Sequence, residues 1–198
     1  MWNKEDLFLY TIILIILLVC LRIYYESDYY NLTCVISDVD GEKYCVRERT
    51  KLHLAADLLA EVTQTCKTLV KELKKKYPNN ENVQRLCKNF NPTKICETLP
   101  TSEHTAYSEN KGEKIAFCLN TTKDGNKLID INTLTFVALH ELSHVMTESQ
   151  GHKRVFWENF KFLLQEAVEL KLYAPIDYKK NPQPYCGMDI NDNPFYDM

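Results

Sequence analysis

Three histidines lie close together in the segment FVALHELSHVMTESQGHKRVFW, at positions 140, 144 and 152, although the whole chain of 198 residues has only five. His140 and His144 are four residues apart, so on a helix they project from one face, about 40° apart around the axis. Two imidazoles placed in this way can bind one zinc ion through ring nitrogens, at about 2.0 to 2.1 Å. The spacing therefore predicts a metal site on a helix.

Glu141 directly follows the first of these histidines and completes the pattern H-E-x-x-H. One step along a helix turns a side chain by about 100°, so Glu141 points beside the metal rather than at it. A carboxylate in this place can take a proton from zinc-bound water and so act as a general base. The pattern is typical of zinc peptidases. The alternative interpretation is a helix whose histidines only make structural hydrogen bonds.

A site of this kind needs a third protein ligand, with the fourth position left for water. His152 is the favoured candidate, because Gly151 before it suits a reversal of the chain that would present the imidazole to the site. The other candidates are carboxylates of the next helix, Glu166 and Glu169, which come 22 and 25 residues after His144. The sequence leaves this choice open. A transition-state oxyanion also needs a donor besides zinc, and Tyr178 and Tyr185 are candidates for it.

Apolar residues at helical spacing predict four helices, over residues 51–77, 81–90, about 133–148 and 156–172. Asn132 is the expected N-cap of the helix that carries the histidines. Residues 115–119 read as a strand that pairs with 126–131 in a hairpin, and residues 91–112 show no regular pattern. We therefore expect an α+β fold: a small, helix-dominated, zincin-like domain with a short β-sheet beside the active-site helix.

The N-terminal segment is apolar, with no charge in residues 7–21, LFLYTIILIILLVCL. Trp2 and the pair Tyr24-Tyr25 provide aromatic anchors at both ends. With Arg22 snorkelling, the run approaches the roughly 20 residues that span a bilayer. No small-residue cleavage site follows it, so the segment is predicted to be an uncleaved signal-anchor rather than a cleaved signal peptide.

Charge and cysteine content indicate where the remainder of the chain lies. Lys4 precedes the apolar run, which favours a cytosolic N-terminus and a lumenal body. Seven of the eight cysteines follow the run, which predicts disulfides and an oxidising compartment. Cys34 and Cys45 bracket the turn signal Asp40-Gly41 and are the pairing we expect. The net charge of −3, with acids and bases mixed, gives no indication of a nucleic-acid partner.

The segment HELSHVMTESQGHKRVFW resembles the minimal zinc metallopeptidases of the WLM and SprT-like group, in which H-E-x-x-H precedes a later histidine and an aromatic pair, here Phe156-Trp157. Seven residues separate His144 from His152, against the usual five. Residues 107–188 also resemble membrane-anchored metallopeptidases of large DNA viruses. The resemblance implies zinc as cofactor, a protein or peptide substrate, and strand addition of that substrate to residues 115–119 at a sheet edge.

The resemblance further implies a viral internal membrane or envelope as the location, and capsid or other virion proteins as partners. We predict a signal-anchor in residues 1–25, a linker with the cysteine-bracketed hairpin in 26–50, and a zincin-like metallopeptidase domain in 51–198. The expected function is that of a membrane-anchored zinc-dependent endopeptidase in which Glu141 activates the zinc-bound water. The alternative is a structural, membrane-tethered virion protein that uses a zincin-like fold for docking rather than for catalysis.

Overall fold

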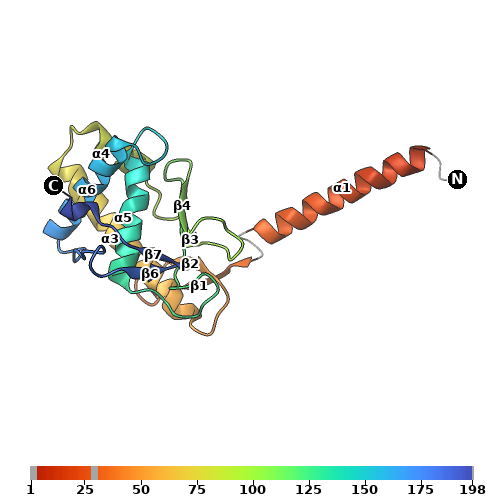
Figure 1. Cartoon of the computed structure of the whole chain (residues 1–198), viewed down its shortest axis with the longest axis horizontal. Coiled ribbons are helices and arrows are strands. Elements are labelled where there is room, and N and C mark those ends of the chain that lie inside the picture. Colours follow the sequence, from red (N-terminus) through yellow and green to blue (C-terminus); the bar gives the residue numbers. More distant parts are fainter. Residues whose placement is uncertain (1–3, 28–30, 198) are drawn as a thin grey trace.

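The computed structural model describes residues 4–27 and 31–197. Its first element, α1 (Lys4–Glu26), extends away from the rest of the molecule (Figure 1). Within it, the 21-residue stretch Glu5–Tyr25 has a mean hydropathy of 2.6, so it is long and apolar enough to cross a membrane. By length and composition this helix can be a membrane anchor or a signal sequence. The predicted aromatic anchor Trp2 lies outside the described residues.

A five-stranded sheet forms the centre of the molecule, with the strand order β1-β2-β3-β5-β4. The strands are β1 (Thr33–Ile36), β2 (Lys43–Val46), β3 (Ile95–Glu97), β4 (Ala106–Glu109) and β5 (Lys114–Phe117). The pairs β1–β2 and β4–β5 are antiparallel, whereas β2–β3 and β3–β5 are parallel. The strands β1 and β4 are therefore the two edges of this sheet, and β5 lies inside it.

Two sequence-based expectations about the strands are wrong. Residues 91–112 are not irregular throughout, because β3 and β4 lie within them. The strand at residues 115–119 does not form a hairpin with 126–131: β5 pairs with β3 and β4, and only an isolated bridge joins Asn120 to Leu128. Both strands are short. β3 gains its hydrogen bonds from β2 and β5, which a local pattern does not reveal, whereas β4 pairs with β5 across a short turn.

The predicted helices are present, with small shifts at their ends. They are α3 (Leu52–Lys76), α4 (Glu81–Asn89), α5 (Ile131–Met146) and α6 (Arg154–Glu169). These helices gather on one side of the sheet, and α1 leaves the molecule on the other (Figure 1). A short hairpin of β6 (Gln183–Tyr185) and β7 (Met188–Ile190), followed by a 3-10 turn at Pro194–Tyr196, ends the chain.

The helix α5 is the central helix of the core, in contact with α3, α4, α6 and β4. It is apolar on nearly all sides, as expected for a helix surrounded by protein. Leu134, Leu142 and Val145 have no exposed surface, and truncation of one of them to alanine is expected to cost about 2 to 5 kcal/mol. The structure thus combines a sheet with a helical layer, in agreement with the predicted α+β fold class.

The hairpin predicted from its cysteines is confirmed. A disulfide joins Cys34 to Cys45, and Gly41 in the turn has φ of 73°, a backbone conformation that glycine adopts without steric cost. Because β2 also pairs with β3, this hairpin belongs to the same sheet as the later strands. The division of the chain into residues 1–25, 26–50 and 51–198 stays a prediction.

Candidate metal centre

The helix α5 begins at Ile131 because Asp130 caps it. The Asp130 carboxylate accepts hydrogen bonds from the backbone N–H of Thr133 at 2.9 Å and from its hydroxyl at 2.6 Å. The prediction of Asn132 as N-cap is wrong: this residue lies inside the first turn and exchanges two hydrogen bonds with the backbone of Ala174. A cap residue needs a non-helical backbone, and Asp130 has one, with φ −74° and ψ 152°.

The three clustered histidines converge on one point. The Nε2 atom of His152 lies 3.1 Å from Nε2 of His140 and 3.1 Å from Nε2 of His144. Ligands at about 2.0 to 2.1 Å from a tetrahedral zinc ion stand about 3.3 Å from one another. The observed separations match that geometry closely, so the three imidazoles fit a zinc ion. Among the described residues they are the group that brings three potential metal ligands together.

Phe156 forms the apolar floor beneath the three imidazoles. Its ring centroid lies 4.9 Å from that of His140, 4.4 Å from His144 and 4.7 Å from His152. Phe156 has no exposed surface and comes from the first turn of α6, where the aromatic pair of the sequence motif is located. Packing against this ring limits the rotamers of all three histidines, which preorganises the site.

His152 lies in the loop between α5 and α6, and several contacts hold this loop in place. The indole Nε1 of Trp157 donates a hydrogen bond to the backbone carbonyl of His152 at 3.1 Å. The ammonium of Lys111, in the turn between β4 and β5, donates to the carbonyls of Thr147 and Ser149, both at 2.9 Å. Gly151 has φ of 74°, so it reverses the chain before His152, as predicted, although α5 already ends at Met146.

Burial keeps the two helical histidines neutral. Desolvation lowers the pKa of His140 to about 3 and that of His144 to about 4, and the positive charge that neighbouring imidazoles would carry acts in the same direction. An imidazole binds a metal through an unprotonated nitrogen, so protons do not compete for these two residues at neutral pH.

Glu141 is buried next to this group, with 4% of its surface exposed. Desolvation raises the pKa of its carboxyl to about 8, and no hydrogen bond or ion pair with a described residue counters that shift. The side chain lines the same cavity as the three histidines. A nearby cation favours the charged form of a carboxyl group, so the protonation of Glu141 depends on the metal. A carboxylate beside the metal, with no protein partner to occupy it, is suited to accept a proton from water.

Glu166 and Glu169, the alternative third ligands, lie in a different environment. Lys76 at the end of α3 donates hydrogen bonds to Glu166 at 2.9 Å and to Glu169 at 2.7 Å. The hydroxyl of Tyr77 also donates to Glu166 at 2.7 Å. The structure therefore brings His152, and neither glutamate, to His140 and His144.

A cleft of about 840 Å³ opens beside the histidines. The edge strand β4 forms one wall and α5 another, and the loop that carries His152 closes one end. The expectation that residues 115–119 form the sheet edge along the cleft is wrong, because β5 lies between β3 and β4. The strand at this edge of the sheet is β4, within a region in which sequence reasoning found no strand.

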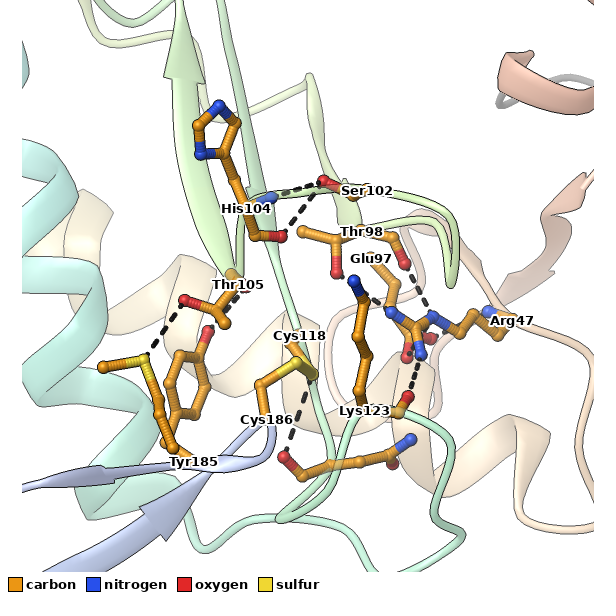
Figure 2. The surroundings of a disulfide bond; sticks show 12 residues. Arg47, Glu97, Thr98, Ser102, His104, Thr105, Cys118, Lys123, Tyr185 and Cys186 are labelled. Atoms are coloured by element: carbon orange, nitrogen blue, oxygen red, sulfur yellow. Dashed lines mark hydrogen bonds and ion pairs between the residues drawn. A yellow bond between two sulfur atoms is a disulfide. The ribbon is translucent and has the colours of Figure 1, made fainter. Parts of the chain in front are cut away.

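The C-terminal hairpin of β6 and β7 forms the remaining wall, and a disulfide fixes it. Cys186, in the turn of this hairpin, is bonded to Cys118, directly after β5 (Figure 2). The hydroxyl of Tyr185 donates to the carbonyl of Thr105 at 3.0 Å, and the Thr105 hydroxyl donates to Met188 Sδ at 3.9 Å (Figure 2). Sequence reasoning missed this wall, because nothing in the local sequence pairs Cys118 with Cys186.

A buried arginine holds the segment to which this disulfide is attached. Arg47 donates from Nε to the carbonyl of Thr98 at 2.6 Å and from Nη1 to the carbonyl of Lys123 at 2.7 Å (Figure 2). Its own backbone N–H donates to Glu97 at 2.7 Å. These bonds connect β2, β3 and the segment after β5. They stabilise the part of the fold to which the disulfide attaches the β6–β7 hairpin.

The two tyrosines considered as oxyanion donors and the two other histidines of the chain lie in different places. Tyr185 is 3% exposed and lines the cleft, whereas Tyr178 has no exposed surface and packs against Phe136, with ring centroids 4.8 Å apart. His53 is exposed on α3. His104 is exposed at the mouth of the cleft, in the loop before β4. Of the two tyrosines, only Tyr185 is near the histidine group.

The chain is similar to a known domain family and to proteins of large DNA viruses. Residues 49–193 match the WLM domain family. The chain is similar to Uncharacterized protein R325 of Acanthamoeba polyphaga mimivirus, with 29% identity over 163 residues, which cover 80% of this chain and 82% of that protein. It is also similar to Uncharacterized protein 136R of Invertebrate iridescent virus 6, with 39% identity over 82 residues, or 41% of this chain and 44% of that protein.

Because the family match covers most of the chain, the protein belongs to the WLM domain family, a zinc-protease-like group. The relatives in large DNA viruses agree with the resemblance found in the sequence. Among solved structures, the crystal structure of Wss1 from Saccharomyces cerevisiae is similar, with a TM-score of 0.47 and 19% identity, covering 64% of this chain and 88% of that chain.

Proposed function

We propose that this protein is a membrane-anchored, zinc-dependent endopeptidase. The observation that carries the proposal is the convergence of three histidine Nε2 atoms, two pairs of which are 3.1 Å apart, beside a buried Glu141 and an open cleft. Three protein ligands facing a cleft are typical of catalytic zinc sites, whereas structural zinc sites have four protein ligands. The histidine group has three members among the described residues, which favours catalysis over a purely structural metal.

His140, His144 and His152 would hold the metal. When bound, zinc supplies a Lewis acid that polarises the peptide carbonyl under attack. Glu141 acts as the general base: its carboxylate oxygen accepts a proton from the attacking water and later returns it to the leaving amine. Its burial excludes bulk water from this transfer, and the absence of a described hydrogen-bond partner leaves both oxygens accessible to the reactants.

The edge strand β4 is where we expect the substrate to bind. A peptide in extended conformation would add to the outer edge of β4 through main-chain hydrogen bonds, while the peptide's side chains contact α5 and the β6–β7 hairpin. The cleft runs past Thr105, Tyr107 and Lys111 on this strand side and past the three histidines on the other. A substrate bound in this way has its backbone carbonyls near the histidine group, so the chemistry is directed at peptide bonds.

The anchor and the compartment belong to the same proposal. The apolar stretch Glu5–Tyr25 retains the enzyme at a membrane, and the body lies in an oxidising compartment, as its two disulfides favour. By similarity to proteins of mimivirus and an iridescent virus, we infer a viral setting, with virion proteins among the substrates or neighbours. Lys4 precedes the apolar run, which favours a cytosolic N-terminus, so α1 would place the body on the lumenal side of the membrane.

The test uses the full chain in detergent, loaded with zinc. Glu141→Gln should bind as much zinc as the wild type and lose about 100- to 10,000-fold in peptide turnover, because general-base catalysis contributes about 10² to 10⁴. Glu61→Gln, at an exposed site of α3, is the matched control and should keep full activity. Full turnover in Glu141→Gln would rule out the assigned base.

His152→Ala tests the third ligand. It should lower the zinc content sharply, because the site retains only two of its three imidazoles. An unchanged zinc content in this variant would show that another residue is the third ligand. A wild-type protein that binds zinc, cleaves no peptide and is present in fixed stoichiometry in assembled particles would favour the structural tether instead.

A further inference from the structure

The connection between the apolar helix α1 and the body is short. Residues 27–32 join α1 to β1, and a fully extended chain of this length reaches at most about 25 Å. The side-chain amide of Asn31 also donates hydrogen bonds to carbonyls at the C-terminal end of α1: those of Tyr24 and Tyr25, both at 3.2 Å, and of Ser27, at 2.8 Å. These carbonyls have no partner within the helix, so Asn31 holds the start of β1 against the end of α1.

The directions of the strands place the start of β4 at the same end of the sheet. β1 and β4 are each antiparallel to their neighbours, whereas β2, β3 and β5 are parallel to one another, so β1 and β4 run in the same direction. The first residues of these strands, Thr33 and Ala106, therefore lie at one end of the sheet. At a strand spacing of about 4.8 Å, they are about 19 Å apart across the five-stranded sheet.

A hollow of about 470 Å³ brings α1 itself next to the cleft. Its walls include Arg22 of α1 and residues of the segment that leads into β4. Three of these residues, Glu103, His104 and Tyr107, also line the cleft that contains the histidines. In the same way, α1 leaves the molecule on the side of the sheet and not on the side of the helical layer (Figure 1). The mouth of the cleft therefore lies beside the C-terminal end of α1.

This end of α1 is the end that would emerge from a membrane. Arg22 is in the last turn of the apolar stretch Glu5–Tyr25, and a long basic side chain at such a position extends to the membrane surface. With α1 in a bilayer, the residues that share the hollow with Arg22 lie close to the surface of that bilayer. The cleft then opens towards the membrane.

We propose that the substrates are proteins anchored in the same bilayer, cut in the extended segment that follows their own membrane anchor. This inference rests on the proposed peptidase function and names its substrate class. A segment that leaves the bilayer beside α1 meets the His104 end of the cleft first, and it can then add along β4 towards the histidines. Because enzyme and substrate are tethered to one surface, their effective concentration depends on the lengths of the two tethers.

The experiment compares cleavage sites at different distances from a membrane. The full chain, loaded with zinc, is reconstituted in phosphatidylcholine vesicles. The probe is an unstructured segment of casein that the protein cuts in solution. It is fused to a transmembrane helix through a flexible linker of about 15 or about 80 residues, and is also supplied without an anchor. We expect the near site to be cut about eightfold faster than the far site, because effective concentration falls as about the −3/2 power of tether length.

A change in the tether of the enzyme tests whether that tether sets the preference. Insertion of about 40 glycine and serine residues after Ser27 should lower the ratio of near to far cleavage to about threefold. Cleavage of the soluble probe should not change. The matched control has the same residues fused before Met1, on the other side of α1, and should keep the wild-type ratio.

The outcomes separate this inference from the proposed function. Equal rates at the two anchored sites, or a faster far site, overturn the inference while cleavage of the soluble probe leaves the peptidase in place. An unchanged ratio in the Ser27 insertion variant also overturns the inference, provided that the variant still cuts the soluble probe. If it does not, the wild-type ratio decides alone. A wild-type protein that cuts no casein segment in any form overturns the proposed function, and this inference with it.

Discussion

In the zinc-free protein, Glu141→Gln is expected to change how stability depends on pH. Burial raises the folded-state pKa of the Glu141 carboxyl to about 8, well above the value of about 4.3 in an unfolded chain. A group whose pKa is raised on folding contributes stability that is fully present below the unfolded pKa and is lost as pH rises through the folded pKa. The loss for Glu141 is therefore spread over the interval between these two pKa values, from about pH 4 to about pH 8.

The magnitude follows from the linkage relation. Each pH unit between the two pKa values is worth about 1.36 kcal/mol for one group. From about pH 6 to pH 8, allowing for half-protonation at the folded pKa, the carboxyl loses about 2 kcal/mol of stabilising free energy. The carboxamide of glutamine does not titrate in this pH range, so Glu141→Gln does not lose this stabilising free energy. The difference in unfolding free energy between Glu141→Gln and the wild type should shift by about 2 kcal/mol in favour of the variant.

The assay is urea unfolding of zinc-free protein at both pH values, followed by circular dichroism. The pKa shifts of His140 and His144 are common to both proteins and cancel in the difference. Glu61→Gln, with an exposed carboxyl, should show no comparable shift. Added zinc should abolish the effect, because a cation next to Glu141 stabilises the carboxylate. A difference between Glu141→Gln and wild type that does not vary with pH would refute the claim that this carboxyl is buried without a partner.

Three other variants test how the site is supported. Trp157→Phe removes the hydrogen bond to the carbonyl of His152 while keeping a ring, and should weaken zinc binding about 10- to 100-fold in a chelator competition; unchanged affinity would contradict the positioning role. Replacing Cys118 and Cys186 by serine opens a bridge with a sequence separation of 68, and should lower the unfolding free energy by up to about 4 kcal/mol and raise KM, with zinc retained. Asp130→Ala should cost about 1 kcal/mol in denaturant unfolding, and a null effect would show that the cap is dispensable.

The sequence was sufficient for features that depend on nearby residues. The long helices follow from apolar spacing, and the H-E-x-x-H pattern needs only a helix to bring His140 and His144 to one face. The bridge between Cys34 and Cys45 was predictable because a short turn joins the two cysteines. In each case the partners are close along the chain, so their geometry is fixed by local backbone conformation.

Features that depend on distant partners could not be predicted in this way. The strand β4 has four residues and no clear alternation, and its place at the sheet edge results from the order of β3, β5 and β4. The choice between His152 and Glu166 likewise depends on Lys76, which pairs with the glutamate from 90 residues away in sequence. The cap of α5 was misplaced by two residues, because Asp130 and Asn132 are both good cap residues.

Removal of zinc should leave the fold intact, which distinguishes this site from small metal-dependent domains. The helix α5 is held by apolar packing, with Leu134, Leu142 and Val145 fully buried, and not by a metal. The loop of His152 is fixed by Trp157 and Lys111, both independent of zinc. Dialysis against a chelator should therefore preserve cooperative unfolding and the far-UV circular dichroism spectrum. The unfolding free energy, and with it Tm, should fall only by the amount that zinc binding contributes. Collapse of the helical signal on chelation would instead show that the metal organises the fold, as in zinc fingers.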